Sequence, residues 1–259
     1  MSISPFPRLL VLCGLLAGCG PADVPFELRF AAASGNAPVD CAGRLADLRF
    51  YVTDLAVLRP DGGRARVDLA ANGRWQGQGI GLIDLEDGTG SCANGTPDGN
   101  DRLVGRVPPG DVAGLSFVIG VPFASNHADP LAAAAPLDDM SMHWHWRSGY
   151  KFLRAAATDG KRRVSVHLGS AGCRGAVTAI EGCNFPNRVA VTLPDWRPGK
   201  SVTVDLGQLL EAVPVGAEPV THCESGPADP ACAGLMPVFG FDVASGAQVM
   251  PQRVFRTGP

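Results

Sequence analysis

The stretch LRFYVTDLAVL, residues 48–58, carries the pattern that decides the fold class. It opens with apolar and polar side chains in alternation, as residues 26–30 (FELRF) do throughout. A period of two residues is typical of a β-strand with one buried face. The stretch ends at Pro60-Asp61-Gly62-Gly63, a strong turn signal, so the pattern predicts a strand followed by a tight reversal.

Working outward from this stretch, the chain reads as many short strands separated by turn residues. Further strands are predicted at residues 79–85, 102–107, 114–121, 150–156, 163–168, 188–193 and 201–206. Residues 205–212 (DLGQLLEA) are the best helix candidate, with Asp205 as its cap. The 33 Gly and 22 Pro suit a chain of tight turns. We therefore expect an all-β fold, an antiparallel β-sandwich or open barrel with long loops and few short helices. Without repeats or a clear linker, residues 26–259 are predicted to form a single domain.

The amino terminus has the pattern of a bacterial export signal. Arg8 precedes a short apolar run at residues 9–16 (LLVLCGLL), which ends at small residues before Cys19. A run this short indicates a cleaved signal peptide, residues 1–18, rather than a membrane span. The segment Leu16-Ala17-Gly18-Cys19 fits a lipobox, which predicts acylation of Cys19 and a tether over residues 19–25. Ordinary cleavage with Cys19 free is the alternative. We expect a lipid-anchored protein of the cell envelope, in the outer membrane and facing the periplasm or the cell surface.

The cysteines predict a disulfide framework. Of eight, Cys13 leaves with the signal and Cys19 carries lipid, which leaves six in the mature chain. An even number in an exported chain indicates three disulfides. Two pairs close short loops, Cys173 with Cys183 and Cys223 with Cys232, and Cys41 then remains for Cys92. A thiolate metal cluster is the rival interpretation, but the chain has no CxxC spacing.

Charge and composition narrow the range of partners. The formal net charge is −3 and no basic stripe is present, which argues against nucleic acid. The loop at residues 87–101 (DGTGSCANGTPDGND) is rich in oxygen-bearing side chains. It is either a solvated turn region or a calcium site, since calcium takes six to eight oxygen ligands.

Histidines and tryptophans cluster in one part of the sequence. Four of the five histidines lie between residues 127 and 167, interleaved with Trp144 and Trp146; they are His127, His143, His145 and His167. With the thiols oxidised, imidazole is the leading metal donor, and copper(II) ranks first for a nitrogen site. If residues 141–146 are extended, His143 and His145 share one face and the two tryptophans the other. The alternative is that the tryptophans are core residues and the histidines occupy strand edges.

An ordered set of short motifs resembles the MbnP-like proteins, also called metallo-mystery-pair four-cysteine proteins. The set runs from about residue 26 to residues 252–256 (QRVFR), and its members are Phe50-Tyr51-Val52, Gly120-Val121-Pro122, Asn126-His127, Asp129-Pro130, Pro136-Leu137, Met140, Trp144-x-Trp146, Gly149-Tyr150-Lys151-Phe152, His167-Leu168-Gly169 and Cys173. Each motif is weak by itself, and their order carries the resemblance.

The resemblance implies a periplasmic or surface copper-binding protein, encoded beside a dihaem cytochrome c peroxidase-like partner of the MbnH type. That partner is understood to oxidise a tryptophan of its substrate to kynurenine. His127 and His167 are the implied ligands of one copper ion, and Trp144 and Trp146 are the candidates for oxidation. The pair His143 and His145 departs from the family pattern and either adds a ligand or replaces one.

Two other function classes stay open. Residues 169–172 lack the spacing of a GxSxG nucleophile elbow, and no HExxH zinc motif occurs, so we do not expect an enzyme. A β-sandwich for adhesion or glycan binding, without metal, would use exposed tryptophans among Trp75, Trp144, Trp146 and Trp196.

Met140 and Met142 are further soft donors, although core packing is the commoner role of methionine. The sequence offers His222 no partner.

Overall fold

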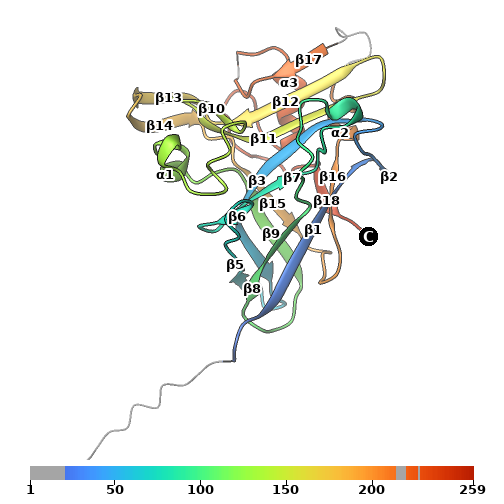
Figure 1. Ribbon diagram of the computed structural model, residues 1–259, viewed down its shortest axis with the longest axis vertical. Helices are drawn as coiled ribbons and strands as arrows, with labels where there is room; N and C mark the ends of the chain where they lie inside the picture. The colour runs from blue at the N-terminus through green and yellow to red at the C-terminus, as the bar shows by residue number, and fades with distance from the viewer. Residues whose placement is uncertain (1–20, 214–219, 227) are drawn as a thin grey trace, which may run out of the picture.

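The 48–58 stretch lies in β3 (Leu45–Leu58), the long strand at the centre of the larger sheet (Figure 1). The structure is a computed structural model, and it describes residues 21–213, 220–226 and 228–259. Almost every residue of β3 is buried, on both faces of the sheet. The signal peptide at residues 1–18 and the predicted acylation of Cys19 lie outside the described residues.

β3 organises a ten-stranded sheet with the order β15-β9-β3-β11-β12-β17. The remaining strands of this sheet pair beside that path, β4 and β7 on β3, β6 on β7 and β10 on β11. The bounds are β4 (Arg64–Arg66), β6 (Gln76–Gly77), β7 (Ile80–Asp84), β9 (Gly114–Ile119), β10 (His143–His145), β11 (Gly149–Thr158), β12 (Arg163–Gly169), β15 (Val189–Leu193) and β17 (Val220–Cys223).

The second layer is a six-stranded sheet with the order β18-β16-β1-β8-β5, to which β2 adds on β1. Its bounds are β1 (Val24–Ser34), β2 (Ala37–Pro38), β5 (Asp68–Leu69), β8 (Arg102–Val107), β16 (Val202–Asp205) and β18 (Phe255–Thr257). A separate hairpin, β13 (Ala171–Ala176) with β14 (Ala179–Phe185), follows β12.

Aromatic side chains from both sheets meet in the core. Phe30 on β1 lies edge-on to Phe50 on β3 with ring centroids 5.3 Å apart, and Phe255 contacts Phe50 at 5.4 Å. All three rings are buried, so the alternating side chains of β1 and β3 point into one shared core. The expected all-β sandwich is confirmed. Two strand pairs are parallel, β1 with β16 and β12 with β17, because long connections return the chain in its original direction.

Helices are short, as expected. They are α1 (Phe123–Asn126), α2 (Gly207–Glu211), α3 (Cys232–Leu235) and the 3-10 turns Gly90–Cys92, Pro130–Ala132 and Met236–Phe239. The predicted helix at 205–212 shrinks to α2, and Asp205 ends β16. Its Oδ1 still accepts the N–H of Gly207 at 3.0 Å, beside the start of that helix. In the described part of the chain, no helix has the length and apolarity that a bilayer crossing needs.

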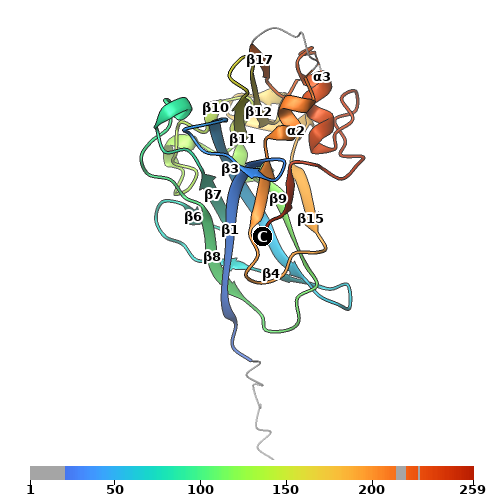
Figure 2. The same cartoon turned by 90° about the vertical axis from the view of Figure 1, so that its right-hand side faces the viewer.

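β10, β11, β12 and β17 gather at one end of the molecule, together with α2 and α3 (Figures 1 and 2). β17 lies along β12 in parallel register, with Ser165 opposite His222. The side chains of His143, His145 and His167 all come from strands that pair with β11, in one sheet.

Candidate functional site

Most of the predicted histidines and tryptophans lie at one of two places on the molecule, the outer face of β12 and β17 or a cavity beside α1. β10 is only three residues long and pairs with β11 through a register shift, with His143 opposite Tyr150 and His145 opposite Gly149. Because neighbouring side chains of a strand point to opposite faces, Trp144 and His143 separate. The ring of Trp144 faces His167, with centroids 6.2 Å apart, whereas His143 packs on Tyr150 at 5.2 Å.

One place is the outer face of β12 and β17, which we call the edge cluster: His167, His222 and Glu224. Their potential ligand atoms all lie within 4.8 Å of one another. The two imidazole rings are edge-on with centroids 4.6 Å apart. Parallel pairing places His222 beside β12, and Glu224 follows the end of β17 with its Oε1 3.1 Å from His222 Nε2.

Burial keeps the imidazole of His167 in the neutral form that can bind a cation. Desolvation lowers the pKa of His167 to about 3, and the neighbouring His222 lowers it further in the same direction. His167 is therefore neutral at physiological pH and has a free lone pair. His222 Nδ1 lies 2.7 Å from Ser165 Oγ and its Nε2 lies 3.1 Å from Glu224 Oε1. Imidazole nitrogens held by outer partners in this way are oriented as metal ligands usually are.

Trp144 completes the surroundings of the edge cluster. The indole covers Gly169 so closely that a Cβ at this glycine would lie 3.2 Å from two ring carbons. Gly169 thus permits the indole to approach the backbone of β12, two residues beyond His167. A side chain at position 169 would crowd both Trp144 and the backbone oxygen of Tyr150, which a Cβ would approach to 2.8 Å.

The other place is a cavity of about 290 Å³ that we call the His127 pocket, lined among others by His127, Asp129, His143 and Trp146. His127 follows α1 and packs on Phe123 with ring centroids 4.7 Å apart. Burial lowers the pKa of His127 and of His143, so both imidazoles favour the neutral form.

Asn126 and Gly149 hold the pocket wall in place. Asn126 Oδ1 accepts the N–H of Tyr150 at 2.8 Å, and its Nδ2 donates to Ser148 O at 2.9 Å. Gly149 has φ +77°, and a Cβ there would lie 2.2 Å from Asn126 O. Only glycine fits this close approach, which joins α1 to the start of β11.

Several predicted donors lie apart from both places. His145 is exposed, and its Nδ1 accepts the N–H of Arg147 at 3.2 Å. Met142 is fully buried in a small apolar cluster with Tyr51 and Tyr150, which is a packing role. Met140 is 49% exposed.

His127 and His167 belong to different groups of potential metal ligands. Within the described ranges, none of the groups of side chains close enough to share a metal ion contains both. Trp144 and Trp146 have different neighbours: Trp144 faces His167, whereas Trp146 lies beyond the end of β10 and packs beside His143 at 5.9 Å. The reason is that β10 ends at His145, so the alternation assumed for residues 141–146 stops early. His222 and Glu224 were not predicted as ligands, because no local pattern encodes the pairing of β17 with β12.

The three predicted disulfides are confirmed as Cys41–Cys92, Cys173–Cys183 and Cys223–Cys232. Two further groups have metal-like spacing, His127 with Cys173 and Cys183, and Asp229 with Cys223 and Cys232. Their sulfurs are consumed in cystine bonds, so neither offers thiolates while the disulfides are intact.

In the 87–101 loop, the acidic side chains have protein partners of their own. Asp87 accepts from the N–H and hydroxyl of Thr89, Asp98 pairs with Arg74, and Asp101 pairs with Arg29. Among residues 87–101, all of which are described, no three carboxylates converge as calcium ligands. These contacts account for the acidic side chains of the loop, and the calcium site stays a prediction.

Ser165 lies next to the edge cluster and forms a serine–histidine–carboxylate chain with His222 and Glu224. Ser165 is 9% exposed and lies on β12 within the sheet. A nucleophile must reach a substrate carbonyl, and this hydroxyl is covered by its neighbours. Its contact with His222 Nδ1 instead orients the imidazole.

A β-sandwich locked by three cystines, with histidines and tryptophans along the outer edge of one sheet, defines a disulfide-braced β protein with a candidate metal centre. The sequence profile of the MbnP family matches residues 23–225, and the chain belongs to this family. This range includes both the His127 pocket and the edge cluster.

Comparison with solved structures gives the same fold. The structure of MbnP from Methylosinus trichosporium matches with a TM-score of 0.78 and 24% identity, covering 92% of this chain and 99% of that chain. At this identity the likeness concerns the fold. No curated protein matches the chain.

Proposed function

We propose that this chain is a non-catalytic, copper-binding lipoprotein of the bacterial envelope, and that the edge cluster of His167, His222 and Glu224 is its principal copper site. The observation that carries the proposal is the approach of two imidazoles and a carboxylate to within 4.8 Å, beside Trp144. Membership of the MbnP family, together with the resemblance described above, supports copper as the metal.

The donor set suits copper for a chemical reason. The edge cluster offers nitrogen and oxygen donors, and copper(II) binds such sites more tightly than other divalent first-row ions. His222 Nε2 and Glu224 now face each other at 3.1 Å. A cation that replaces the proton between His222 Nε2 and Glu224 is bound by both side chains. Ser165 still hydrogen-bonds to Nδ1 of His222.

Trp144 is the better candidate for conversion to kynurenine, because Trp144 and not Trp146 neighbours His167. Indole offers only an N–H donor. Opening its pyrrole ring gives an aryl amine and a ketone, both able to approach a metal. A dihaem cytochrome c peroxidase-like partner is the proposed oxidant of Trp144.

Copper content tests the site. After dialysis, the purified wild-type chain is expected to keep about one copper per chain, with nitrogen ligation in its electron paramagnetic resonance spectrum. The double variant His167→Ala/His222→Ala is expected to keep none. The matched control, His127→Ala/His143→Ala, removes two imidazoles from the His127 pocket and should retain the ion. Loss of copper in the control and retention in the edge-cluster variant would reverse the assignment.

Mass spectrometry of the native chain from cells tests maturation. The N-terminal peptide is expected to begin with acylated Cys19, and fragment ions should place the tryptophan-to-kynurenine mass change at Trp144 only when the dihaem partner is present. An unacylated terminus contradicts the lipid anchor. Conversion at Trp146, or none with an active partner, contradicts the choice of Trp144.

A further inference from the structure

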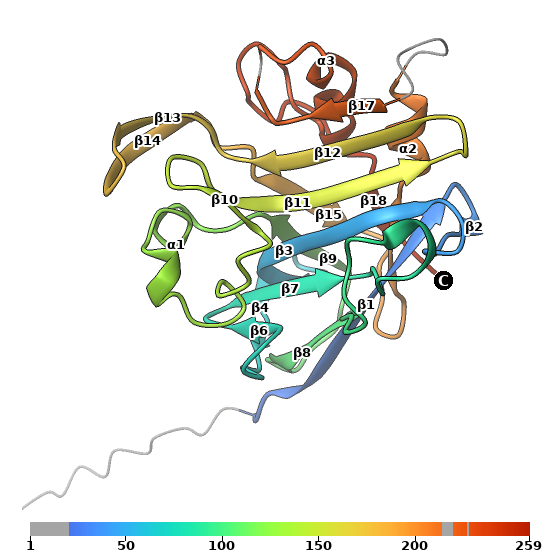
Figure 3. The same ribbon diagram turned by 45° about the horizontal axis from the view of Figure 1, so that its top comes forward.

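The hairpin of β13 and β14 carries a disulfide that differs from the other two in its surroundings. Cys173 and Cys183 are directly opposed residues of this two-stranded sheet, which projects from the end of β12 (Figure 3). The bond therefore links neighbouring strands of one hairpin, and it is not needed to join the two large sheets.

Access also distinguishes this disulfide. Cys183 is half-buried, whereas both cysteines of each of the other two bonds are at most 3% exposed. Thiol–disulfide exchange requires that an attacking thiolate reach a sulfur atom. A reductant therefore meets Cys183 before it meets the remaining cystine sulfurs.

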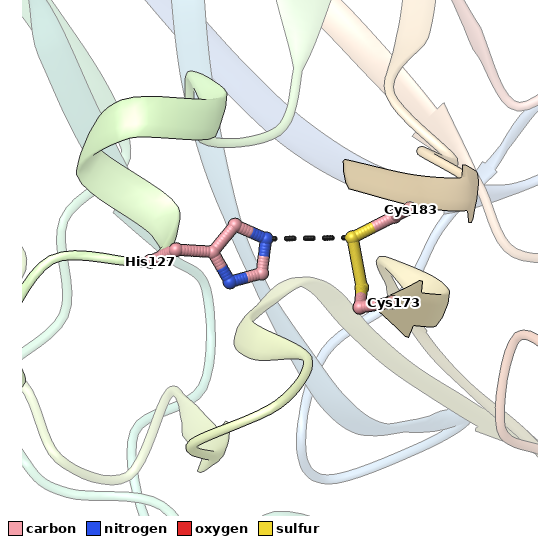
Figure 4. Close-up of side chains that lie close together, drawn as sticks. All are labelled: His127, Cys173 and Cys183. Atoms are coloured by element: carbon pink, nitrogen blue, oxygen red, sulfur yellow. Dashed lines mark hydrogen bonds between the residues drawn. A yellow bond between two sulfur atoms is a disulfide. The ribbon is translucent and has the colours of Figure 1, made fainter. Parts of the chain in front are cut away.

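The imidazole of His127 faces this disulfide. Figure 4 shows the imidazole directed at the sulfur of Cys183, with Nε2 3.4 Å from Sγ. Two backbone hydrogen bonds, to Tyr150 N–H and to Ser148 O, fix the orientation of the Asn126 amide. Its remaining N–H points to His127 Nε2 at 3.2 Å, so Nε2 is the acceptor nitrogen. Neither Nε2 nor the cystine sulfur then carries a proton in this contact.

The other ring nitrogen of His127, Nδ1, is buried and has no hydrogen-bond partner among the described residues. The polar contacts of this imidazole with Asn126 and Cys183 are both made by Nε2. A buried polar atom without a partner is costly and calls for an explanation, such as a bound ion or a redox role of the site.

We propose that a dithiol reductant opens Cys173–Cys183 and thereby creates a second copper site, for monovalent copper, from two thiolates and His127 Nε2. One potential ligand atom from each of the three residues lies within 4.8 Å of the others. Monovalent copper is soft and prefers thiolate ligands, which the edge cluster lacks. The site shares no residue with the edge cluster and does not depend on it.

The reaction balances without another reactant. A thiolate of the dithiol attacks one cystine sulfur, the S–S bond breaks, and the second sulfur leaves as a thiolate. The second thiol of the reductant then attacks the mixed disulfide, so that the reductant is oxidised to its own disulfide and the chain gains two thiols. Binding of the copper ion releases the two thiol protons to water.

Stepwise reduction tests the proposal. The oxidised full-length chain is treated anaerobically with dithiothreitol and desalted, and free thiols are then mapped by alkylation and mass spectrometry. Cys173 and Cys183 are expected to be alkylated first, with Cys41, Cys92, Cys223 and Cys232 still oxidised. Titration with copper(I) against a chromophoric chelator should then show one additional ion, with sulfur neighbours in X-ray absorption.

Variants separate this site from the edge cluster. Cys173→Ser/Cys183→Ser should lose the additional ion, and His127→Ala should weaken it by at least tenfold, since even outer partners of metal ligands contribute about 10- to 100-fold. His167→Ala/His222→Ala should keep it, which distinguishes failure here from failure of the proposed function. Earlier opening of another disulfide, no additional ion after reduction, or an additional ion that persists in the serine variant would each overturn the proposal.

Discussion

Replacing Arg49 with methionine is expected to lower the free energy of unfolding by about 3–5 kcal/mol at pH 8, because the change leaves buried carboxylates without their cation. Arg49 lies on β3, and its Nε is 2.5 Å from Glu86 Oε1. The side chains of Arg49 and Glu86 are 4% and 1% exposed. Methionine keeps much of the apolar stem, so the measured loss reports mainly on charge.

The loss should shrink at lower pH. Desolvation raises the pKa of Glu86 to about 7, above its ordinary value of 4.5. The folded state therefore holds this proton more tightly than the unfolded state, and stability falls as the pH rises between these two values. Without Arg49 the pKa of Glu86 rises further, so the variant should differ least from wild type near pH 5.

Urea unfolding of Arg49→Met and Arg29→Met at both pH values is the measurement. Arg29 is the matched control, since it pairs with Glu27 and Asp101 but is 49% exposed, and such pairs contribute about 0–1 kcal/mol. Equal losses in the two variants would contradict the burial argument. Arg49 Nη1 also donates to Ser141 Oγ at 2.8 Å, so the variant should loosen the loop that leads into β10.

The second large effect is expected at Cys41–Cys92. Changing both residues to alanine should lower the free energy of unfolding by about 4 kcal/mol, because the bond spans 51 residues and restricts the unfolded chain strongly. The bond fastens the 3-10 turn Gly90–Cys92 to the segment before β3. There Cys41 O accepts the N–H of Ser91 at 2.7 Å.

Cys173→Ala/Cys183→Ala is the matched control for that change. This bond spans only 10 residues, for which the same loop argument gives about 3 kcal/mol. Guanidinium unfolding of both double variants, with the cysteine pairing confirmed by mass spectrometry, provides the comparison. A larger loss for the hairpin bond than for Cys41–Cys92 would show that loop length does not govern these disulfides.

Local pattern predicted much of this fold. The strands with clear alternation or continuous apolar character, β1, β3, β9 and β11 among them, were found because burial imposes a period on neighbouring residues. Two cystine pairs were found because their partners are close in sequence, and Cys41 was assigned to Cys92 because these two cysteines remained. The hairpin β13–β14 escaped, since its Gly-rich and polar residues are mostly exposed and leave no apolar period.

The candidate site was predictable only where its residues lie together in sequence. His143, His145 and the two tryptophans were found as a cluster, but which side chains share a face depends on where β10 ends. His222 and Glu224 were not found because β17 reaches β12 by parallel pairing across 50 or more residues, and no local pattern encodes that register. The motifs therefore could not predict the edge cluster, because it forms by the pairing of strands that are distant in the sequence.

That parallel pairing has a consequence for when the proposed ion is acquired. Residues 163–166 meet residues 220–223 only after the intervening chain has folded and returned alongside them. In the unfolded chain His167 and His222 are far apart, so the proposed ion is loaded only after β17 has paired with β12. An ion bound by residues of both β12 and β17 then stabilises the pairing of these strands. Each tenfold rise in free copper above the dissociation constant adds about 1.4 kcal/mol to the stability of the paired form. The supply of copper would thus determine how stable the pairing of β12 with β17 is.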